Sequence, residues 1–152
     1  MIKWQKFTDM TGLEVYEVFL LRQQVFMLEQ DCLYQDIDHT DIQALHCRYL
    51  DDNQQLLGYL RILPPAGAEE LTIGRLAVRK KFRRSGIATE MMKYALDICQ
   101  QHFPNSKIRL AAQSYLIEFY RSLGFTDIGP SYMEDDIPHQ DMHLLDNDKM
   151  KI

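Results

Sequence analysis

Apolar residues recur at helical spacing in three parts of the chain. Between residues 86 and 103 they stand at i, i+4, i+7/i+8 and i+11, which places them on one face of a helix. Residues 11–30 repeat apolar side chains less regularly. Because Thr11 stands three residues before a glutamate, as in a capping box, we predict a helix there with a break midway. A shorter helix is predicted over residues 115–123, with Gly124 as its left-handed terminator.

Short apolar runs between these helices predict β-strands. The run at residues 71–78 is apolar and β-branched enough for a central strand, whereas residues 31–44 have the composition of a polar loop. Residues 51–53, Asp-Asp-Asn, predict a hairpin turn between two of the runs. The predicted strands cover residues 45–50, 56–63, 71–78, 108–112, 126–131 and 139–145.

The order of these elements predicts a mixed α/β sheet. One helix is followed by three strands, and then strands and helices alternate until a final strand pair. Strand–helix–strand alternation implies a parallel crossover, and the consecutive strands before it imply an antiparallel meander. With 152 residues, 46% of them hydrophobic, the chain can build a core without metal or disulfides. We expect one domain over residues 4–146 and a short polar tail over residues 147–152.

Charge, cysteine use and hydropathy narrow the class of protein. The formal net charge of −5 argues against general binding of nucleic acid. No apolar run approaches the roughly 20 residues of a membrane span, and residues 1–6 do not resemble a signal peptide. Cys32, Cys47 and Cys99 are widely spaced, which suggests reduced thiols in a cytoplasmic protein, with Cys99 packed in the core. On a strand, His139 and His143 would lie roughly 13 Å apart, so we expect no metal site there.

A basic loop precedes the most regular of the predicted helices. Residues 79–84 carry five basic side chains in six positions, and Ser85, Gly86 and Ala88 follow. A helix N-terminus offers unpaired N–H groups, small residues let a phosphate approach them, and arginines add charge-assisted contacts, so the pattern indicates pyrophosphate binding. A solvated basic face, a localisation signal or a nucleic-acid patch are the alternatives. The buried strand before the loop favours the phosphate interpretation, although the spacing matches neither a P-loop nor a dinucleotide fingerprint.

Two segments of the chain, one after the other, resemble motifs of a known family. Residues 73–78 followed by Arg83-Arg84-Ser85-Gly86-Ile87-Ala88 resemble the acetyl-CoA motif of the GNAT N-acetyltransferase superfamily, and Gln113 with residues 119–125 resembles its second signature. The family's usual Asn is Gln113 in this chain. Residues 21–30, 34–38 and 137–139 are similar to the ElaA-like branch of that superfamily.

The resemblance implies a GNAT-like fold with acetyl-CoA as co-substrate. The sheet would splay beside the strand that holds residues 76–78, pantetheine would pair with that backbone, and the pyrophosphate would bind the N–H groups of the basic loop and helix start. The cofactor-binding residues that it implies are Leu76, Ala77, Val78, Arg83, Arg84, Ser85, Gly86, Ile87, Ala88, Thr89 and Gln113.

The resemblance also implies catalytic roles. Tyr120 occupies the position of the family's usual general acid, which protonates the leaving thiolate; a core tyrosine is the alternative. Many relatives carry a carboxylate where this chain has Gly74, so the base is sought elsewhere. Glu29 and His139 are candidates for contact with the substrate or for the general base. The alternative for Glu29 is a surface carboxylate without a catalytic role, and the alternative for His139 is an exposed histidine at the end of a strand. Gln113 either holds a pantetheine amide or caps the following helix.

We therefore expect a cytoplasmic N-acetyltransferase that moves an acetyl group from acetyl-CoA to a primary amine. The acceptor would be a small molecule or a peptide, with no metal and no nucleic-acid or membrane partner, and a homodimer is compatible with the sequence. An enzyme similar to acyl-homoserine-lactone synthases and a non-catalytic CoA-binding or nucleic-acid-binding module are the alternatives. Acidic residues would either steer a cationic amine or lie in solvated loops. These acids are Glu29, Asp31, Asp36, Asp38, Asp41, Glu134, Asp135 and Asp136.

Overall fold

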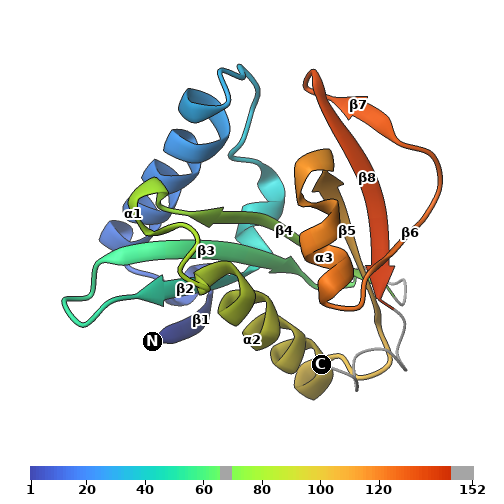
Figure 1. The fold of residues 1–152 in the computed structure, drawn as a ribbon. Helices are drawn as coiled ribbons and strands as arrows, with labels where there is room; N and C mark the ends of the chain where they lie inside the picture. Colours follow the sequence, from blue (N-terminus) through green and yellow to red (C-terminus); the bar gives the residue numbers. More distant parts are fainter. Residues whose placement is uncertain (66–69, 145–152) are drawn as a thin grey trace.

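A mixed β-sheet forms the frame of the computed structural model, which describes residues 1–65 and 70–144 (Figure 1). Within these residues the strand order is β1-β2-β3-β4-β5-β8-β6, and β7 pairs with another part of β8. The β4–β5 pair is parallel and the other neighbouring strands of this part of the chain are antiparallel, as the predicted meander and crossover require. The strands are β1 (Ile2–Lys6), β2 (Leu45–Leu50), β3 (Leu56–Leu63), β4 (Glu70–Val78), β5 (Lys107–Gln113), β6 (Thr126–Asp127), β7 (Tyr132–Glu134) and β8 (Ile137–Leu144).

Helices cover both faces of the sheet. One face carries α1 (Gly12–Arg22), which runs directly into a π-helix (Gln23–Glu29), and the other carries α2 (Ile87–His102) and α3 (Ile117–Ser122). The predicted capping box is present, with Thr11 and Glu14 bonded to each other's backbone N–H. Short 3₁₀ helices complete the set: Phe7–Asp9, His39–Ile42, Lys80–Phe82 and Ser114–Leu116.

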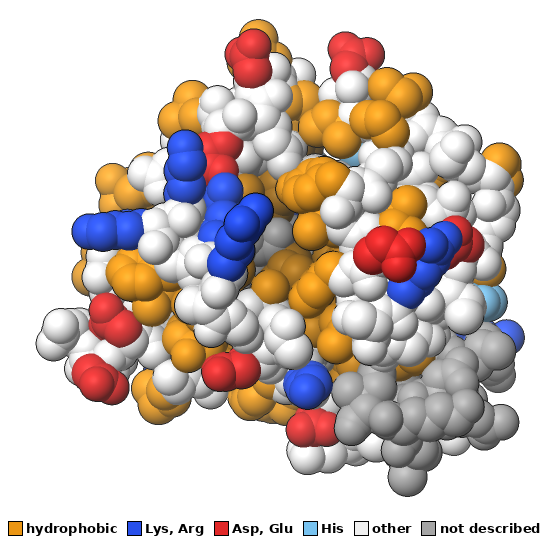
Figure 2. Space-filling view, in the orientation of Figure 1, with side chains coloured by type: hydrophobic (Ala, Val, Ile, Leu, Met, Phe, Trp, Pro, Cys, Tyr) orange, Lys and Arg blue, Asp and Glu red, His pale blue; other side chains and the backbone are white. Residues whose placement is uncertain are grey.

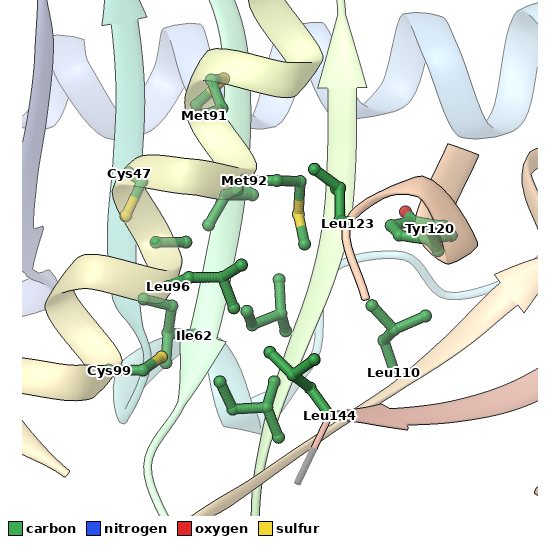
Figure 3. Close-up of a cluster of buried hydrophobic side chains, with 14 of the residues drawn as sticks. Cys47, Ile62, Met91, Met92, Leu96, Cys99, Leu110, Tyr120, Leu123 and Leu144 are labelled. Atoms are coloured by element: carbon green, nitrogen blue, oxygen red, sulfur yellow. The ribbon is translucent and has the colours of Figure 1, made fainter. Parts of the chain in front are cut away.

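The larger core lies between α2, α3 and the sheet (Figure 3). Met91, Met92 and Leu96 of α2 are buried there at 3% exposure or less, because the helix presents its whole apolar stripe to the strands. The helix approaches β3 closely at Gly58, where a Cβ atom would lie 2.8 Å from the Met91 sulfur. Cys99 is buried in the same core, which confirms the packing prediction.

The sheet opens between β4 and β5. These strands pair only over Glu70–Thr72 and Lys107–Arg109, and beyond that point they point apart (Figure 1). A β-bulge on the β3–β4 side accompanies the opening, because Arg61 opposes Gly74 whereas Tyr59 opposes Ala77. Arg75 lies in this bulge with φ of 56°, a left-handed conformation that a non-glycine residue adopts rarely. The expected mixed α/β, GNAT-like fold with a splayed central strand is confirmed.

Several local predictions were wrong. The first element is β1, a half-exposed edge strand whose mixed composition gave no clear period. Residues 126–131 contain only the two-residue β6. The strand β7 was missed because its three residues are all exposed and therefore show no apolar pattern. The helix predicted from residue 115 begins with a 3₁₀ turn. Residues 31–44, which were predicted as a loop, also contain a short 3₁₀ helix. The end of the last strand at residue 145 and the tail at residues 147–152 lie outside the described residues.

Candidate functional site

Two adjoining cavities occupy the opening between β4 and β5, visible as a hollow in Figure 2. The first, here called the β8 cavity, measures about 420 Å³, and the second, the α2 cavity, about 510 Å³. Both cavities have the same few residues in their walls, so they meet at the point where the strands diverge. The shared lining residues are Val25, Gln30, Leu76, Tyr115 and Leu116.

The α2 cavity combines a strand edge, a basic loop and a helix N-terminus. Gly86 is the N-cap of α2, has φ of 88°, and would hold a Cβ atom with nothing within 4 Å. Only glycine takes this conformation without strain, and it leaves the first N–H groups of a 16-residue helix without a side-chain cap. Such a terminus attracts anions. The predicted cofactor residues that line this cavity are Leu76, Ala77, Val78, Arg83, Arg84, Gly86, Ile87, Ala88 and Thr89.

Ser85 and Glu29 each make a contact within the protein that the sequence did not predict. The Ser85 hydroxyl donates to the carbonyl of Phe82 at 2.5 Å, and Ser85 lines neither cavity. Glu29 lines the α2 cavity, where its carboxylate accepts a hydrogen bond from Arg83 Nη2 at 2.6 Å. Arg83 Nε donates to the Val78 carbonyl at 2.9 Å. Glu29 is thus a partner of the basic loop, and its role as a base stays a prediction without support from these contacts.

The β8 cavity brings together Tyr120, Gln113 and His139, which lie far apart in sequence. Burial raises the pKa of the Tyr120 phenol above its usual value, and the nearby Tyr115 raises it further. This hydroxyl therefore keeps its proton at neutral pH. Gly74 also lines the cavity, and a Cβ atom there would meet nothing within 4 Å. The cavity wall therefore has open space at Gly74.

His139 lies on β8 opposite Gln113 of β5 and is only 7% exposed, so the expectation of an exposed strand-end histidine was wrong. Its Nδ1 lies 2.7 Å from the Ile137 carbonyl, which can only accept a hydrogen bond. The Nδ1 atom therefore carries the proton, and in the neutral ring Nε2 has a free lone pair. Nε2 lies 3.6 Å from a carboxylate oxygen of Glu134, which also lines the cavity.

An ion-pair network that sequence reasoning missed lies beside the β8 cavity and contributes two arginines to its wall. Arg22 is completely buried and binds Asp36 at 2.9 Å and Asp41 at 2.7 Å. Arg61 binds Asp41 at 2.8 Å, and both Asp36 and Asp41 are less than 5% exposed. Neither prediction for these two acids, steering of an amine or solvation in a loop, was right. Further pairs join Arg61 to Asp38 and Arg75 to Asp36, and Arg61 and Arg75 line the cavity.

The arginines of the network hold Asp38 and Asp41 in the charged form. Burial by itself would raise the pKa of Asp41, but hydrogen bonds and charge from Arg22, with further help from Arg61, keep it below the ordinary value. The pKa of Asp38 is likewise lowered despite burial, through hydrogen bonds from Arg61 and Thr40. The segment that reads as a polar loop is therefore fixed against the sheet by charge.

Gln30 and Gln113 join the two sides of the opening. Each carboxamide donates to the other, at 3.1 Å from Gln30 Nε2 and 3.3 Å from Gln113 Nε2. Gln113 precedes the 3₁₀ turn at Ser114 but makes no side-chain cap there, so the capping alternative was wrong. Gln30 was not among the predicted site residues, because nothing in its local sequence identifies its partner 83 positions away.

Residues 1–65 and 70–144 contain no group of three or more His, Cys, Asp or Glu side chains that could hold a metal ion. None of the helices in these residues has both the length and the apolar character needed to cross a membrane.

The splayed sheet, its bulged central strand and the cavity at a helix N-terminus define an acyltransferase fold of the GNAT type. The chain belongs to the GNAT family: the family model described as an acetyltransferase (GNAT) domain matches residues 8–145. The chain is 36% identical over 143 residues to the protein ElaA of Escherichia coli, covering 91% of this chain and 94% of that protein. The ElaA-like resemblance is confirmed.

Solved structures agree with this assignment. The crystal structure of an acyl-CoA N-acyltransferase from Pseudomonas aeruginosa matches with a TM-score of 0.89 and 33% identity, covering 95% of this chain and 98% of that one. A CoA-dependent acyl-homoserine lactone synthase, MesI, matches with a TM-score of 0.73 over 99% of this chain and 94% of its own. Its identity is 16%, so that likeness shows the fold alone.

Proposed function

We propose that this protein transfers an acetyl group from acetyl-CoA to a primary amine of a small molecule or peptide. The observation that carries the proposal is the pair of adjoining cavities in the splay. One ends at the basic loop and the N-terminus of α2, and the other contains Tyr120 and His139. A diphosphate fits the first end, because backbone N–H groups, the helix dipole and Arg84 all favour negative charge there.

The thioester would then lie at the junction, with the acceptor amine in the β8 cavity. The amine nitrogen attacks the thioester carbonyl carbon, and the C–S bond breaks when the tetrahedral intermediate collapses. His139 Nε2 is available to take the proton that the amine loses, directly or through water, since Nδ1 already donates to the Ile137 carbonyl. Tyr120 donates its phenolic proton to the leaving sulfur. A carboxylate oxygen of Glu134 lies 3.6 Å from His139 Nε2, the atom that receives this proton.

The charges of the β8 cavity support an amine as acceptor. The arginines in its wall, Arg61 and Arg75, are paired with carboxylates of the ion-pair network. Glu134 and Asp135 line the other side, where they add negative charge next to His139. This balance attracts a cationic group to the cavity and disfavours an anionic one.

The test is a screen of amines with acetyl-CoA, in which release of free CoA thiol is measured against hydrolysis without amine. With an accepted amine, Tyr120→Phe should lower kcat about 10²-fold and leave the Kd of acetyl-CoA unchanged, because the phenol acts only on the leaving group. Tyr16→Phe, at a residue 61% exposed on α1, is the control and should keep normal turnover. No amine-dependent thiol release, together with no binding of acetyl-CoA, would contradict the proposal.

A further inference from the structure

The carboxamide of Gln30 lies where the two cavities meet. It belongs to the wall of both, whereas its partner Gln113 belongs only to the β8 cavity. Among the residues shared by the cavities, Val25, Leu76 and Leu116 are apolar, and Tyr115 is 73% exposed. Gln30 is therefore the shared residue that offers a half-buried polar side chain at this junction.

Each glutamine of the pair offers a hydrogen-bond donor and an acceptor, the two kinds of group that a secondary amide of a ligand can bind. Each carboxamide accepts one hydrogen bond and donates one to the other, and each keeps a second N–H and spare acceptor capacity. The pantetheine arm of CoA carries two amides, each with one N–H and one carbonyl, and acetyl-CoA adds a thioester carbonyl. A secondary amide is trans, so its N–H and its carbonyl point in opposite directions and only one of them can meet a given carboxamide. One such amide, or the thioester carbonyl, can therefore replace one of the two hydrogen bonds that Gln30 makes to Gln113.

A ligand that spans both cavities lies against the glutamine pair, because Gln30 lines both of them. Gln30 follows the π-helix on one side of the opening, and Gln113 ends β5 on the other, so their hydrogen bonds bridge the opening at a residue that lines both cavities. An acyl chain that passes from the α2 cavity to the β8 cavity runs past Gln30, and a chain that takes the place of Gln113 breaks the contact between the two side chains. The loss of one partially buried amide contact must then be offset by a new one.

We propose that Gln30 is a cofactor-binding residue that exchanges Gln113 for an amide or the thioester carbonyl of the acyl-pantetheine arm. The inference rests on the proposed function, since it requires acyl-CoA to occupy both cavities. A purely structural alternative is that the pair braces the two sides of the opening. The cofactor-binding role and the structural role differ in whether binding of the pantetheine part of CoA depends on Gln30.

The experiment compares two ligands by calorimetry: acetyl-CoA, and adenosine 3′,5′-bisphosphate, which has the nucleotide end but no pantetheine. Gln30→Leu keeps the side chain's size and removes its hydrogen bonds. We expect a loss of about tenfold in acetyl-CoA affinity, the range of a single hydrogen bond, with the bisphosphate Kd within twofold of wild type. Gln23→Leu, an exposed glutamine in the same π-helix, should leave both affinities unchanged.

A second variant keeps the test decisive if Gln30→Leu does not fold. Gln30→Glu can still accept a hydrogen bond from Gln113 but cannot donate one, and its charge effect on phosphate is measured by the bisphosphate. The ratio of the acetyl-CoA affinity to the bisphosphate affinity should fall, as it should for Gln30→Leu. A folded variant whose ratio equals that of wild type, or which binds acetyl-CoA more tightly, overturns the inference. The glutamine pair would then have only the structural role of bracing the opening. Failure of the wild-type protein to bind acetyl-CoA would instead remove the proposed function, and the inference with it.

Discussion

Replacing Asp41 by asparagine removes a carboxylate that two buried arginines share. Asp41 accepts hydrogen bonds from Arg22 Nη1 at 2.7 Å and Arg61 Nη1 at 2.8 Å, and it is 2% exposed. Asparagine keeps the shape and one acceptor, but the two guanidinium groups then lack one of their buried counter-charges. Removing one partner of a buried ion pair costs about 3–5 kcal/mol. Because Asp36 and Asp38 remain as partners, we expect about 3 kcal/mol.

This loss is large against the total stability of a domain, which is about 5–15 kcal/mol. Urea unfolding at neutral pH measures it as a lower midpoint with an unchanged slope. The control is Glu70→Gln, which weakens an exposed pair with Arg109 at 3.8 Å and should cost under about 1 kcal/mol. If Asp41→Asn costs no more than the control, the network does not hold the loop of residues 31–44 to the sheet, and the reasoning fails.

Three further predictions follow from the α2 cavity and the ion-pair network. Gly86→Ala should weaken acetyl-CoA binding at least tenfold by calorimetry, because its Cβ enters the anion site; Gly129→Ala, which has the same open surroundings and a φ of 69°, should impose similar strain without that loss. Glu29→Gln should tighten acetyl-CoA binding severalfold at low salt, since it removes a negative charge and frees Arg83; weaker binding would mean that Glu29 orients this arginine. Asp38 has a lowered pKa in the folded state, so the unfolded chain takes up protons first as the pH falls. Its contribution to the free energy of unfolding should therefore be complete above pH 5 and decline below about pH 4, and urea titrations of Asp38→Asn should lack this part of the decline.

The sequence by itself determined the elements whose signals are local. The period of the apolar residues in α2, the capping box of α1 and the glycine that begins α2 each act through neighbours within one or two helical turns. The resemblance carried by the basic loop and Tyr120 could likewise be read from short segments. These signals were enough for the fold class and for most of the α2 cavity.

Tertiary structure alone decided the surroundings of the β8 cavity. The acids of residues 31–44 read as solvated, but Asp36 and Asp41 are buried because folding brings Arg22 and Arg61 to them from α1 and β3. His139 is buried because β7 folds back onto β8, and β7 is too short to show a pattern. Gln30 meets Gln113 only because the sheet opens between β4 and β5. A charge or a hydrogen bond depends on which partner three-dimensional packing supplies, and no local pattern in the chain encodes that partner.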